Sequence, residues 1–182
     1  SSYTFSFNED KTKKIMPRSW DDQGRGLRMR DQFATVLKFN AVDKKWFFFN
    51  GSYWQEDIGN QRVELAAERV ANSIKKEKPE LSFSTKTDED KAMNEWYRFQ
   101  KDSRSHMAKM HMIDEFKKYV IVKHGEFDKE DMLLNTESGY VDLSSGELHD
   151  HDIDKKFSHQ TVAEYSDNVD APLWEKFLNQ IF

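Results

Sequence analysis

Apolar residues recur with a helical period over the central part of the chain. Between about residues 60 and 77 they fall at positions i, i+3, i+4, i+7, i+8 and i+11: Val63, Ala66, Ala67, Val70, Ala71 and Ile74. A spacing that follows the 3.6-residue turn predicts an amphipathic helix with one buried face. Lysines gather where this pattern ends, just before Pro79, as the negative end of a helix dipole favours.

Two more helices are predicted after this one. The first begins near Thr87, because Thr-x-x-Asp resembles a capping box. Its expected buried residues are Ala92, Met93, Trp96, Tyr97 and Phe99. The second runs from about Ser105 to Lys118 and turns an apolar face inward. That face consists of Met107, Met110, Ile113 and Phe116. The segment 119–122 either extends this helix or forms a short strand.

Short runs of β-branched and aromatic residues flank the helices and predict strands. Before them, the runs Thr35–Phe39, Lys45–Phe49 and Ser52–Trp54 indicate a three-stranded meander, with the turn residues Asn50-Gly51 between the last two. After them, Met132–Leu134 and Tyr140–Leu143 are separated by a glycine-containing turn, which predicts a hairpin or meander. The expected fold class is therefore α+β, with a three-helix core flanked by small antiparallel hairpins.

The two ends of the chain have sequence patterns that differ from those of the middle. Residues 1–18 are polar and of mixed charge, which predicts an N-terminal arm or linker. Residues 20–26 are expected to form a turn leading into a short helix near Leu27–Phe33. Residues 19–170 form the predicted α+β domain, and 171–182 a C-terminal helix that starts at Pro172. Its apolar stripe is Trp174, Phe177, Leu178 and Ile181.

The last third of the chain resembles the region that precedes the superfamily-3 helicase domain in primase–helicases of phages, satellite phages, plasmids and large DNA viruses such as poxviruses. That family has an LLN-x-GxxDLxTG-like hairpin and then a Tyr, an Ala, a Pro and W-x-x-F-L. The matching residues here are Leu133, Leu134, Asn135, Gly139, Asp142, Leu143, Gly146, Tyr165, Ala171, Pro172, Trp174, Phe177 and Leu178. Ser145 and Leu173 depart from the pattern. Upstream, a W-x-x-x-D-G-x-x-W hairpin is matched by Trp46, Asn50, Gly51 and Trp54.

The resemblance implies a non-catalytic accessory domain in a replicative primase–helicase. Such a domain would link the primase and ATPase modules of one polypeptide, aid assembly of a homo-oligomeric ring and help engage single-stranded or forked DNA. We expect no cofactor in this chain, with ATP and Mg²⁺ confined to the parent's helicase module. The sequence contains no GxxxxGK[ST] loop, which ATP hydrolysis by that mechanism needs. The stripe formed by Trp174, Phe177, Leu178 and Ile181 is predicted to dock on that module.

Charge is distributed unevenly along the 182 residues, whose net charge is −5. Residues 1–62 carry a net +3, residues 63–125 a net +2 and residues 126–182 a net −10. A DNA-facing surface is therefore expected in the first two-thirds, because phosphates repel the acidic tail. The candidate DNA-binding residues are Arg25, Arg28, Arg30, Lys75, Lys76, Lys78, Lys117 and Lys118. Trp46, Trp54 and Trp96 are expected in the core rather than stacked on bases.

Two alternative functions stay open from the sequence. The run His149-Asp150-His151-Asp152-Ile153-Asp154 alternates imidazoles and carboxylates, which are ligand types for transition metals. A stand-alone metal-dependent hydrolase or nuclease would use His149, His151, Asp152 and Asp154. An exposed polar loop is the favoured interpretation, so no metal site and no catalytic residue is assigned. The other alternative is a protein–protein adaptor without DNA contact.

Composition restricts where the protein works. There are no cysteines, so neither a disulfide framework nor a cysteine-based zinc site can form. No apolar run approaches the roughly 20 residues that span a bilayer. We therefore expect a protein of the cytoplasm without a membrane partner, and the resemblance implies a bacterial host or a virus replication site.

Overall fold

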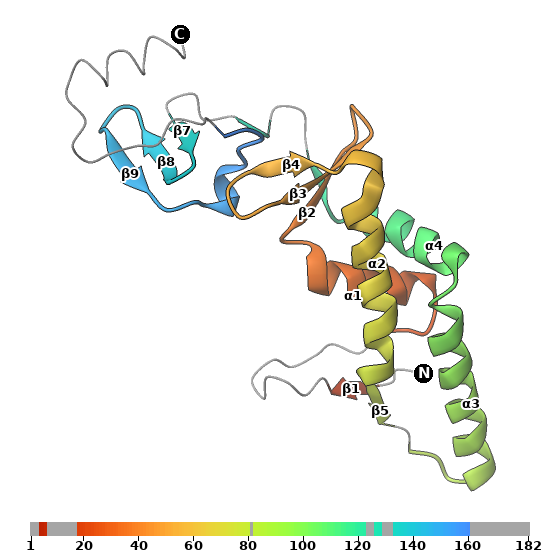
Figure 1. Ribbon diagram of the computed structural model, residues 1–182. Coiled ribbons are helices and arrows are strands. Elements are labelled where there is room, and N and C mark those ends of the chain that lie inside the picture. The colour runs from red at the N-terminus through yellow and green to blue at the C-terminus, as the bar shows by residue number, and fades with distance from the viewer. Residues whose placement is uncertain (1–3, 7–17, 81, 123–125, 129–132, 161–182) are drawn as a thin grey trace. The chain divides into compact units, whose positions relative to one another are not determined.

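The described residues fall into two compact units (Figure 1). The computed structural model describes residues 4–6, 18–80, 82–122, 126–128 and 133–160. The first unit comprises residues 1–48 and 57–123, and the second residues 49–56 and 124–182. Helices and short antiparallel strands occur together, which confirms the predicted α+β class. The predicted C-terminal helix over 171–182 and most of the predicted arm over 1–18 lie outside the described residues.

Four α-helices occur in the described part of the first unit: α1 (Asp22–Phe33), α2 (Gln61–Ser73), α3 (Lys86–Asp102) and α4 (His106–Lys117). Helix α2 is preceded by a 3-10 turn over Ile58–Asn60 and followed by another over Ile74–Lys76. All six apolar positions that predict α2 are buried, so its predicted face is confirmed. The carboxylate of Asp57 accepts hydrogen bonds from the amides of Arg62 and Val63, each at 2.9 Å, and so caps the start of α2.

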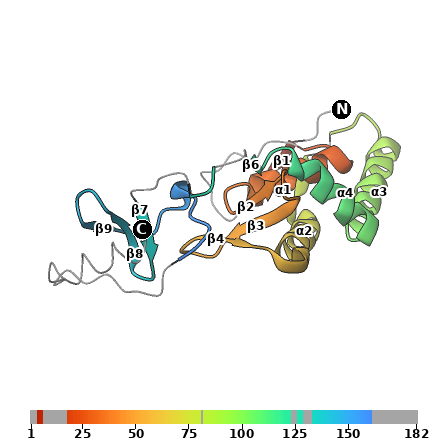
Figure 2. The ribbon, with the colours of Figure 1, turned by 90° about the horizontal axis from the view of Figure 1, so that it is seen from above.

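A small sheet lies beside these helices (Figure 2). Strand β2 (Leu37–Asn40) pairs antiparallel with β3 (Lys45–Phe49) and parallel with β6 (Ile121–Val122). Of the two alternatives for residues 119–122, the short strand is therefore the one that forms. Strands β1 (Thr4–Ser6) and β5 (Lys78–Glu80) pair antiparallel in a separate ribbon. The core between helices and sheet includes a stacked pair, Trp46 on Phe116, with ring centroids 5.7 Å apart.

Helices α1 and α4 pack side by side and run in the same direction. Asp22 meets His111, Gly26 meets Glu115, and Arg30 meets Tyr119. Each pair is separated by 89 positions in sequence, and successive pairs are one helical turn apart. With this offset, α4 ends level with Arg28 and α1 continues to Phe33, so the last turns of the two helices lie near each other, where the negative ends of both helix dipoles favour cations.

Helix α1 begins five residues earlier than the sequence indicates. Gly24 and Gly26 were expected in a turn, but both lie inside the helix, which Asp21 caps by accepting a hydrogen bond from the Gly24 amide at 2.8 Å. A Cβ atom on Gly24 would lie 1.9 Å from the Ser19 carbonyl oxygen, and one on Gly26 would lie 2.5 Å from the Glu115 Cβ atom. These glycines allow close backbone approach, a need that local sequence does not reveal.

Replacing Gly26 by alanine should destabilise the first unit. The added methyl group forces α1 away from α4, and we expect the free energy of unfolding to fall by about 2 kcal/mol, as overpacking typically costs. Urea denaturation followed by circular dichroism measures this loss. Gln23→Ala, at an exposed position of the same helix, is the matched control and should change stability by less than about 0.5 kcal/mol. A Gly26→Ala protein as stable as the wild type would contradict the close approach.

Helices α3 and α4 confirm the two helices predicted for this part of the chain, but several details of those predictions were wrong. The side chain of Thr85, not Thr87, caps α3 by accepting from the Asp88 amide. Trp96 and Phe99 are buried and pack with Ile74 in a second apolar cluster. Tyr97 and Met107, which were expected on the buried faces, are 59% and 69% exposed. Their helices are covered on one side alone, and the core positions of α4 are Ala108, Met112, Ile113 and Phe116.

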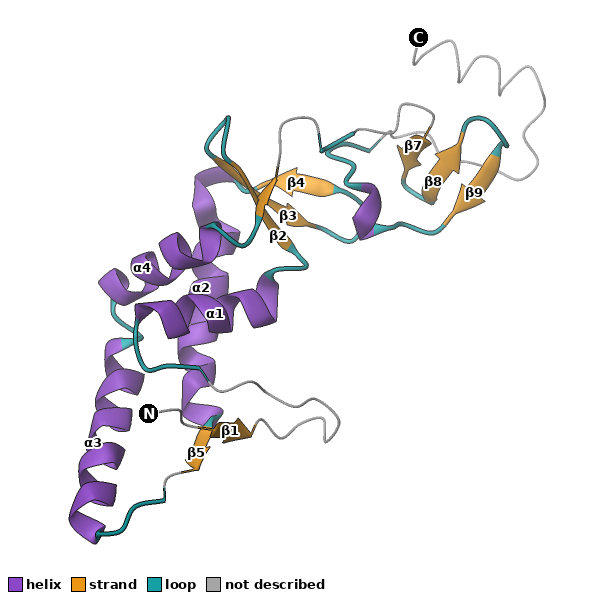
Figure 3. Cartoon of the chain, turned by 180° about the vertical axis from the view of Figure 1, so that it is seen from behind, coloured by secondary structure: helices purple, strands orange, loops and turns teal. Residues whose placement is uncertain are grey.

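The second unit contains β4 (Trp54–Glu56) and a meander of β7 (Leu133–Thr136), β8 (Gly139–Asp142) and β9 (Glu147–His149) (Figure 3). The meander confirms the expected hairpin and adds a third strand. A 3-10 turn follows over Ile153–Lys155. Trp54 is 1% exposed, and its indole nitrogen donates to the Ile153 carbonyl oxygen at 3.0 Å. Trp46, Trp54 and Trp96 are all core residues, which confirms that interpretation.

Candidate functional site

Two of the predicted DNA-binding arginines are buried within the first unit. The Nε atom of Arg25 donates to the Ser103 hydroxyl at 2.8 Å, and its guanidinium lies 4.6 Å from the centroid of the Phe99 ring. Arg28 is 3% exposed and forms a bidentate ion pair with the Glu77 carboxylate, with N–O distances of 2.8 and 3.1 Å. It also donates to the Ser19 carbonyl oxygen at 2.7 Å. Both side chains hold helices and loops together, and DNA contact by either finds no support in their geometry.

Three other predicted residues gather where α1 and α4 end. The Arg30 guanidinium lies 5.0 Å and the Lys118 ammonium 5.4 Å from the centroid of the Tyr119 ring, while Lys117 lies over Phe39. We call Arg30, Lys117, Lys118 and Tyr119 the Tyr119 cluster. A hydrogen bond to Glu115, at 2.8 Å, raises the pKa of Lys118 above its ordinary value.

Carboxylates balance most of the positive charge in the Tyr119 cluster. Arg30 lies 3.7 Å from Asp31, and Lys117 lies 3.8 Å from Asp114. The Tyr119 ring has cations beside it, which leaves it poorly placed to stack on a base. Because these cations lie at the C-terminal ends of two helices, packing and dipole effects account for the cluster without DNA.

The remaining predicted cations are Lys75, Lys76 and Lys78, which we call the lysine triad. Lys75 and Lys76 lie in the 3-10 turn after α2, and Lys78 lies in β5. All three are exposed, and none pairs with a carboxylate of the described residues. The acidic neighbour in sequence, Glu77, is buried against Arg28 and does not offset them. The triad is therefore a concentrated positive charge that solvent reaches freely.

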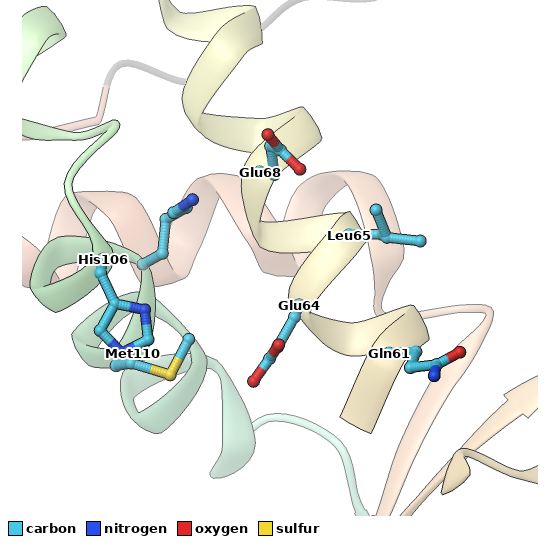
Figure 4. A pocket seen from close by; sticks show the side chains of 7 residues that line it. Gln61, Glu64, Leu65, Glu68, His106 and Met110 are labelled. Carbon is cyan, nitrogen blue, oxygen red and sulfur yellow. The ribbon is translucent and has the colours of Figure 1, made fainter. Parts of the chain in front are cut away.

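A groove of about 340 Å³ lies between α2 and α4. One wall is a continuous face of α2, formed by Gln61, Glu64, Leu65 and Glu68, and the other wall is formed by His106, Lys109 and Met110 of α4. Figure 4 shows Glu64 extending from α2 toward the side where His106 and Met110 lie. Leu65 is 59% exposed although it is a large apolar residue. No pattern in the sequence predicted this groove.

The charged side chains of the groove are not held in ion pairs by other described residues. Within the described part of the chain, Glu64, Glu68 and Lys109 form no ion pair. Arg62, two positions before Glu64, points its guanidinium over the Phe48 ring at 4.9 Å from the centroid. Leu65 is the sequence signal that could have revealed the groove. It is adjacent in sequence to the buried residues of α2, but it lies on the face of the helix that is otherwise polar.

The His149–Asp154 segment does not assemble as a cluster. His149 ends β9 and stacks on Tyr140, with ring centroids 5.0 Å apart. His151 turns toward Asn135 Oδ1 and the Glu137 carbonyl oxygen, at 3.2 and 3.1 Å. Asp152 accepts from the Asp154 amide and so begins the 3-10 turn. Among the residues whose placement is described, no group of three or more histidines, aspartates or glutamates is arranged to hold a metal ion.

Asn135 is the central polar residue of the second unit. It is 1% exposed, and its amide nitrogen donates to the carbonyl oxygens of Ser52 and His159, at 3.1 and 3.0 Å. Its oxygen faces His151. Asparagine side chains commonly close local turns, but the partners of the Asn135 amide are 83 and 24 residues away. It joins three separate segments.

Asp142, by contrast, closes a local turn. Its carboxylate accepts from the hydroxyl and the amide of Ser144, at 2.6 and 2.9 Å. These hydrogen bonds, the hydroxyl's first, lower the pKa of Asp142 below its ordinary value. Its role is structural.

The predicted docking residues Trp174, Phe177, Leu178 and Ile181 lie outside the described residues. Their role stays a prediction. No helix in the described ranges has the length and apolar character needed to cross a membrane.

The fold and its surfaces define a small α+β domain with a buried arginine–glutamate link, an exposed lysine triad and an acidic groove. A family model described as D5 N terminal like matches residues 26–182, which is most of the chain. The chain therefore belongs to this family, the N-terminal domain of D5-like phage and viral primase–helicase proteins. The resemblance read from the hairpin and tail motifs is thereby confirmed. No curated protein matches the sequence.

Proposed function

We propose that this chain is a non-catalytic accessory domain that joins the primase and ATPase modules of a D5-like protein and aids assembly of its ring during DNA replication. The family match over residues 26–182 carries this proposal, because it places the chain in primase–helicase proteins. ATP and Mg²⁺ would bind in the helicase module of the parent protein. The expected setting is the cytoplasm of a bacterial host or a virus replication site.

The DNA contact within this function falls to the lysine triad. Three exposed ammonium groups within four residues, without described carboxylate partners, can approach phosphates without first breaking an ion pair. The Tyr119 cluster has equal formal charge from Arg30, Lys117 and Lys118, but each of these cations already has a carboxylate within 4 Å. Counterion release from DNA favours the cations that are not already neutralised.

A matched pair of triple variants tests the triad. Lys75→Gln/Lys76→Gln/Lys78→Gln and Arg30→Gln/Lys117→Gln/Lys118→Gln each remove three positive charges. Binding to labelled single-stranded and forked DNA is measured by fluorescence anisotropy at several salt concentrations. For the triad variant we expect the slope of log K against log salt to become shallower by about 2, since each phosphate contact contributes about 0.7–0.9. The Tyr119 cluster variant should keep most of the wild-type slope.

Two other outcomes would contradict DNA contact by the lysine triad. Equal losses in the two triple variants would mean that net charge alone governs binding, and the triad would lose its special role. No binding by the wild type even at low salt would leave an adaptor that connects modules without touching DNA. Circular dichroism of each variant confirms that the fold is intact before binding is compared.

A further inference from the structure

The groove between α2 and α4 has the features of a protein docking site and plays no part in the DNA contact proposed above. Its α2 wall places the exposed Leu65 beside two carboxylates, Glu64 and Glu68, which are one helical turn apart. Met110 adds a flexible apolar surface on the opposite wall. Met107, next to it in α4, is 69% exposed, so apolar side chains continue beyond the groove.

A contiguous exposed apolar surface marks an interaction site, and Leu65 and Met110 contribute apolar surface on the two walls of this groove. Two carboxylates that lack described partners restrict what a covering surface can be. An acidic partner would be repelled, and a purely apolar one would bury Glu64 and Glu68 without compensation. A partner with lysine or arginine side chains spaced one turn apart can pair with both carboxylates and place an apolar residue on Leu65.

We propose that this groove binds an amphipathic helix whose apolar residues are flanked by lysine or arginine. A helix fits because the walls are themselves helical faces, and helices pack by laying ridges of side chains into such grooves. Lys109 on the α4 wall faces the other flank of the bound helix and favours an uncharged or acidic residue there. The polarity of the groove therefore also sets the orientation of the bound helix.

The test uses two synthetic helical peptides with the same leucine stripe, one with lysines and the other with glutamates beside it. Anisotropy of the fluorescein-labelled peptides is measured against the full chain. We expect the lysine peptide to bind and the glutamate peptide to bind at least about tenfold more weakly, because two ion pairs are replaced by two repulsions. A third peptide, with serine in place of the leucines, should also bind poorly.

Variants of the chain locate the binding. Glu64→Lys/Glu68→Lys should weaken binding of the lysine peptide by about tenfold or more, and Leu65→Ser should weaken it without a change in net charge. The matched control is Asp90→Lys/Glu95→Lys, which makes the same charge change at exposed positions of α3. Because the chain has a net charge of −5, it attracts any basic peptide at long range. This control shows whether that general attraction alone accounts for the binding.

The proposal fails if the two double variants weaken binding equally, or if the lysine and glutamate peptides bind alike. It also fails if no peptide binds to a wild-type chain shown to be folded. In the glutamine variant Glu64→Gln/Glu68→Gln, which keeps side-chain size, a loss of binding supports the proposal and unchanged binding contradicts it. These peptides contain no phosphate, so the outcome is independent of whether the lysine triad contacts DNA.

Discussion

Replacing Arg28 by alanine is expected to lower the free energy of unfolding by about 3–5 kcal/mol, the usual cost of removing one partner from a buried ion pair. Glu77 would be left 8% exposed with no described cation against it, and the Ser19 carbonyl oxygen would lose its donor. Urea denaturation followed by circular dichroism gives the change. Arg30→Ala is the matched control, since Arg30 lies two positions later in the same helix in a surface ion pair, and should cost less than about 1 kcal/mol.

The pair can be tested further by removing both charges together. Arg28→Met/Glu77→Leu should recover much of the stability lost in Arg28→Ala, because neither substituted side chain carries a charge into the interior. DNA affinity of Arg28→Lys, measured well below its melting temperature, should match the wild type. If Arg28→Ala lowers the free energy of unfolding no more than Arg30→Ala does, the buried ion pair does not stabilise the first unit.

Replacing Asn135 by aspartate should destabilise the second unit by about 3 kcal/mol, although the two side chains have almost the same shape. The substitution turns the donor nitrogen into a carboxylate oxygen, so the carbonyl oxygens of Ser52 and His159 lose their hydrogen bonds and face a negative charge. Urea denaturation monitored by amide NMR signals from β7 and β8 reports on this unit directly.

Asn94→Asp is the matched control for that variant. Asn94 is exposed in α3, and its substitution adds the same negative charge without a buried contact. Its expected effect is within about 0.5 kcal/mol. Equal effects at the two positions would indicate that added charge, rather than the lost hydrogen bonds, determines stability.

Sequence periodicity predicts the elements that are buried on one face. Helix α2 is the clearest case, because Val63, Ala67 and Val70 lie on a single stripe and nothing in that segment competes with the pattern. The hairpin motif around Asn135 and Asp142 also places β7 and β8 correctly. The third strand β9 was missed because it contains one apolar residue, Leu148, which is too little for a pattern.

Features that depend on distant partners are not visible in local sequence. Asp21, followed by a run with two glycines, reads as a turn until α4 is known to pack against Gly26. Arg25 and Arg28 look like surface cations because their partners, Ser103 and Glu77, are 78 and 49 residues away. For the same reason, Tyr97 and Met107 follow the apolar period of their helices and yet remain exposed, because none of the residues that the structure describes covers them.

The lysine triad and the groove also differ in how far local sequence predicts them. The lysine triad is recognisable from sequence because three lysines lie close together, although the burial of Glu77 between them is known from the structure alone. The groove requires two helices whose facing residues are about 40 positions apart, and no local pattern joins them. Leu65 is the one residue that departs from the polar character of its face.

The parallel pairing of α1 with α4 has a consequence for biosynthesis. Helix α1 must wait for a partner that is synthesised 89 residues later, a delay of several seconds at about 5–20 residues per second. Until then its two glycines, each about 1 kcal/mol less favourable than alanine in a helix, leave it poorly formed. Met29, which is fully buried in the finished unit, would remain in water throughout that interval. The nascent chain is therefore most open to chaperones and proteases before α4 appears.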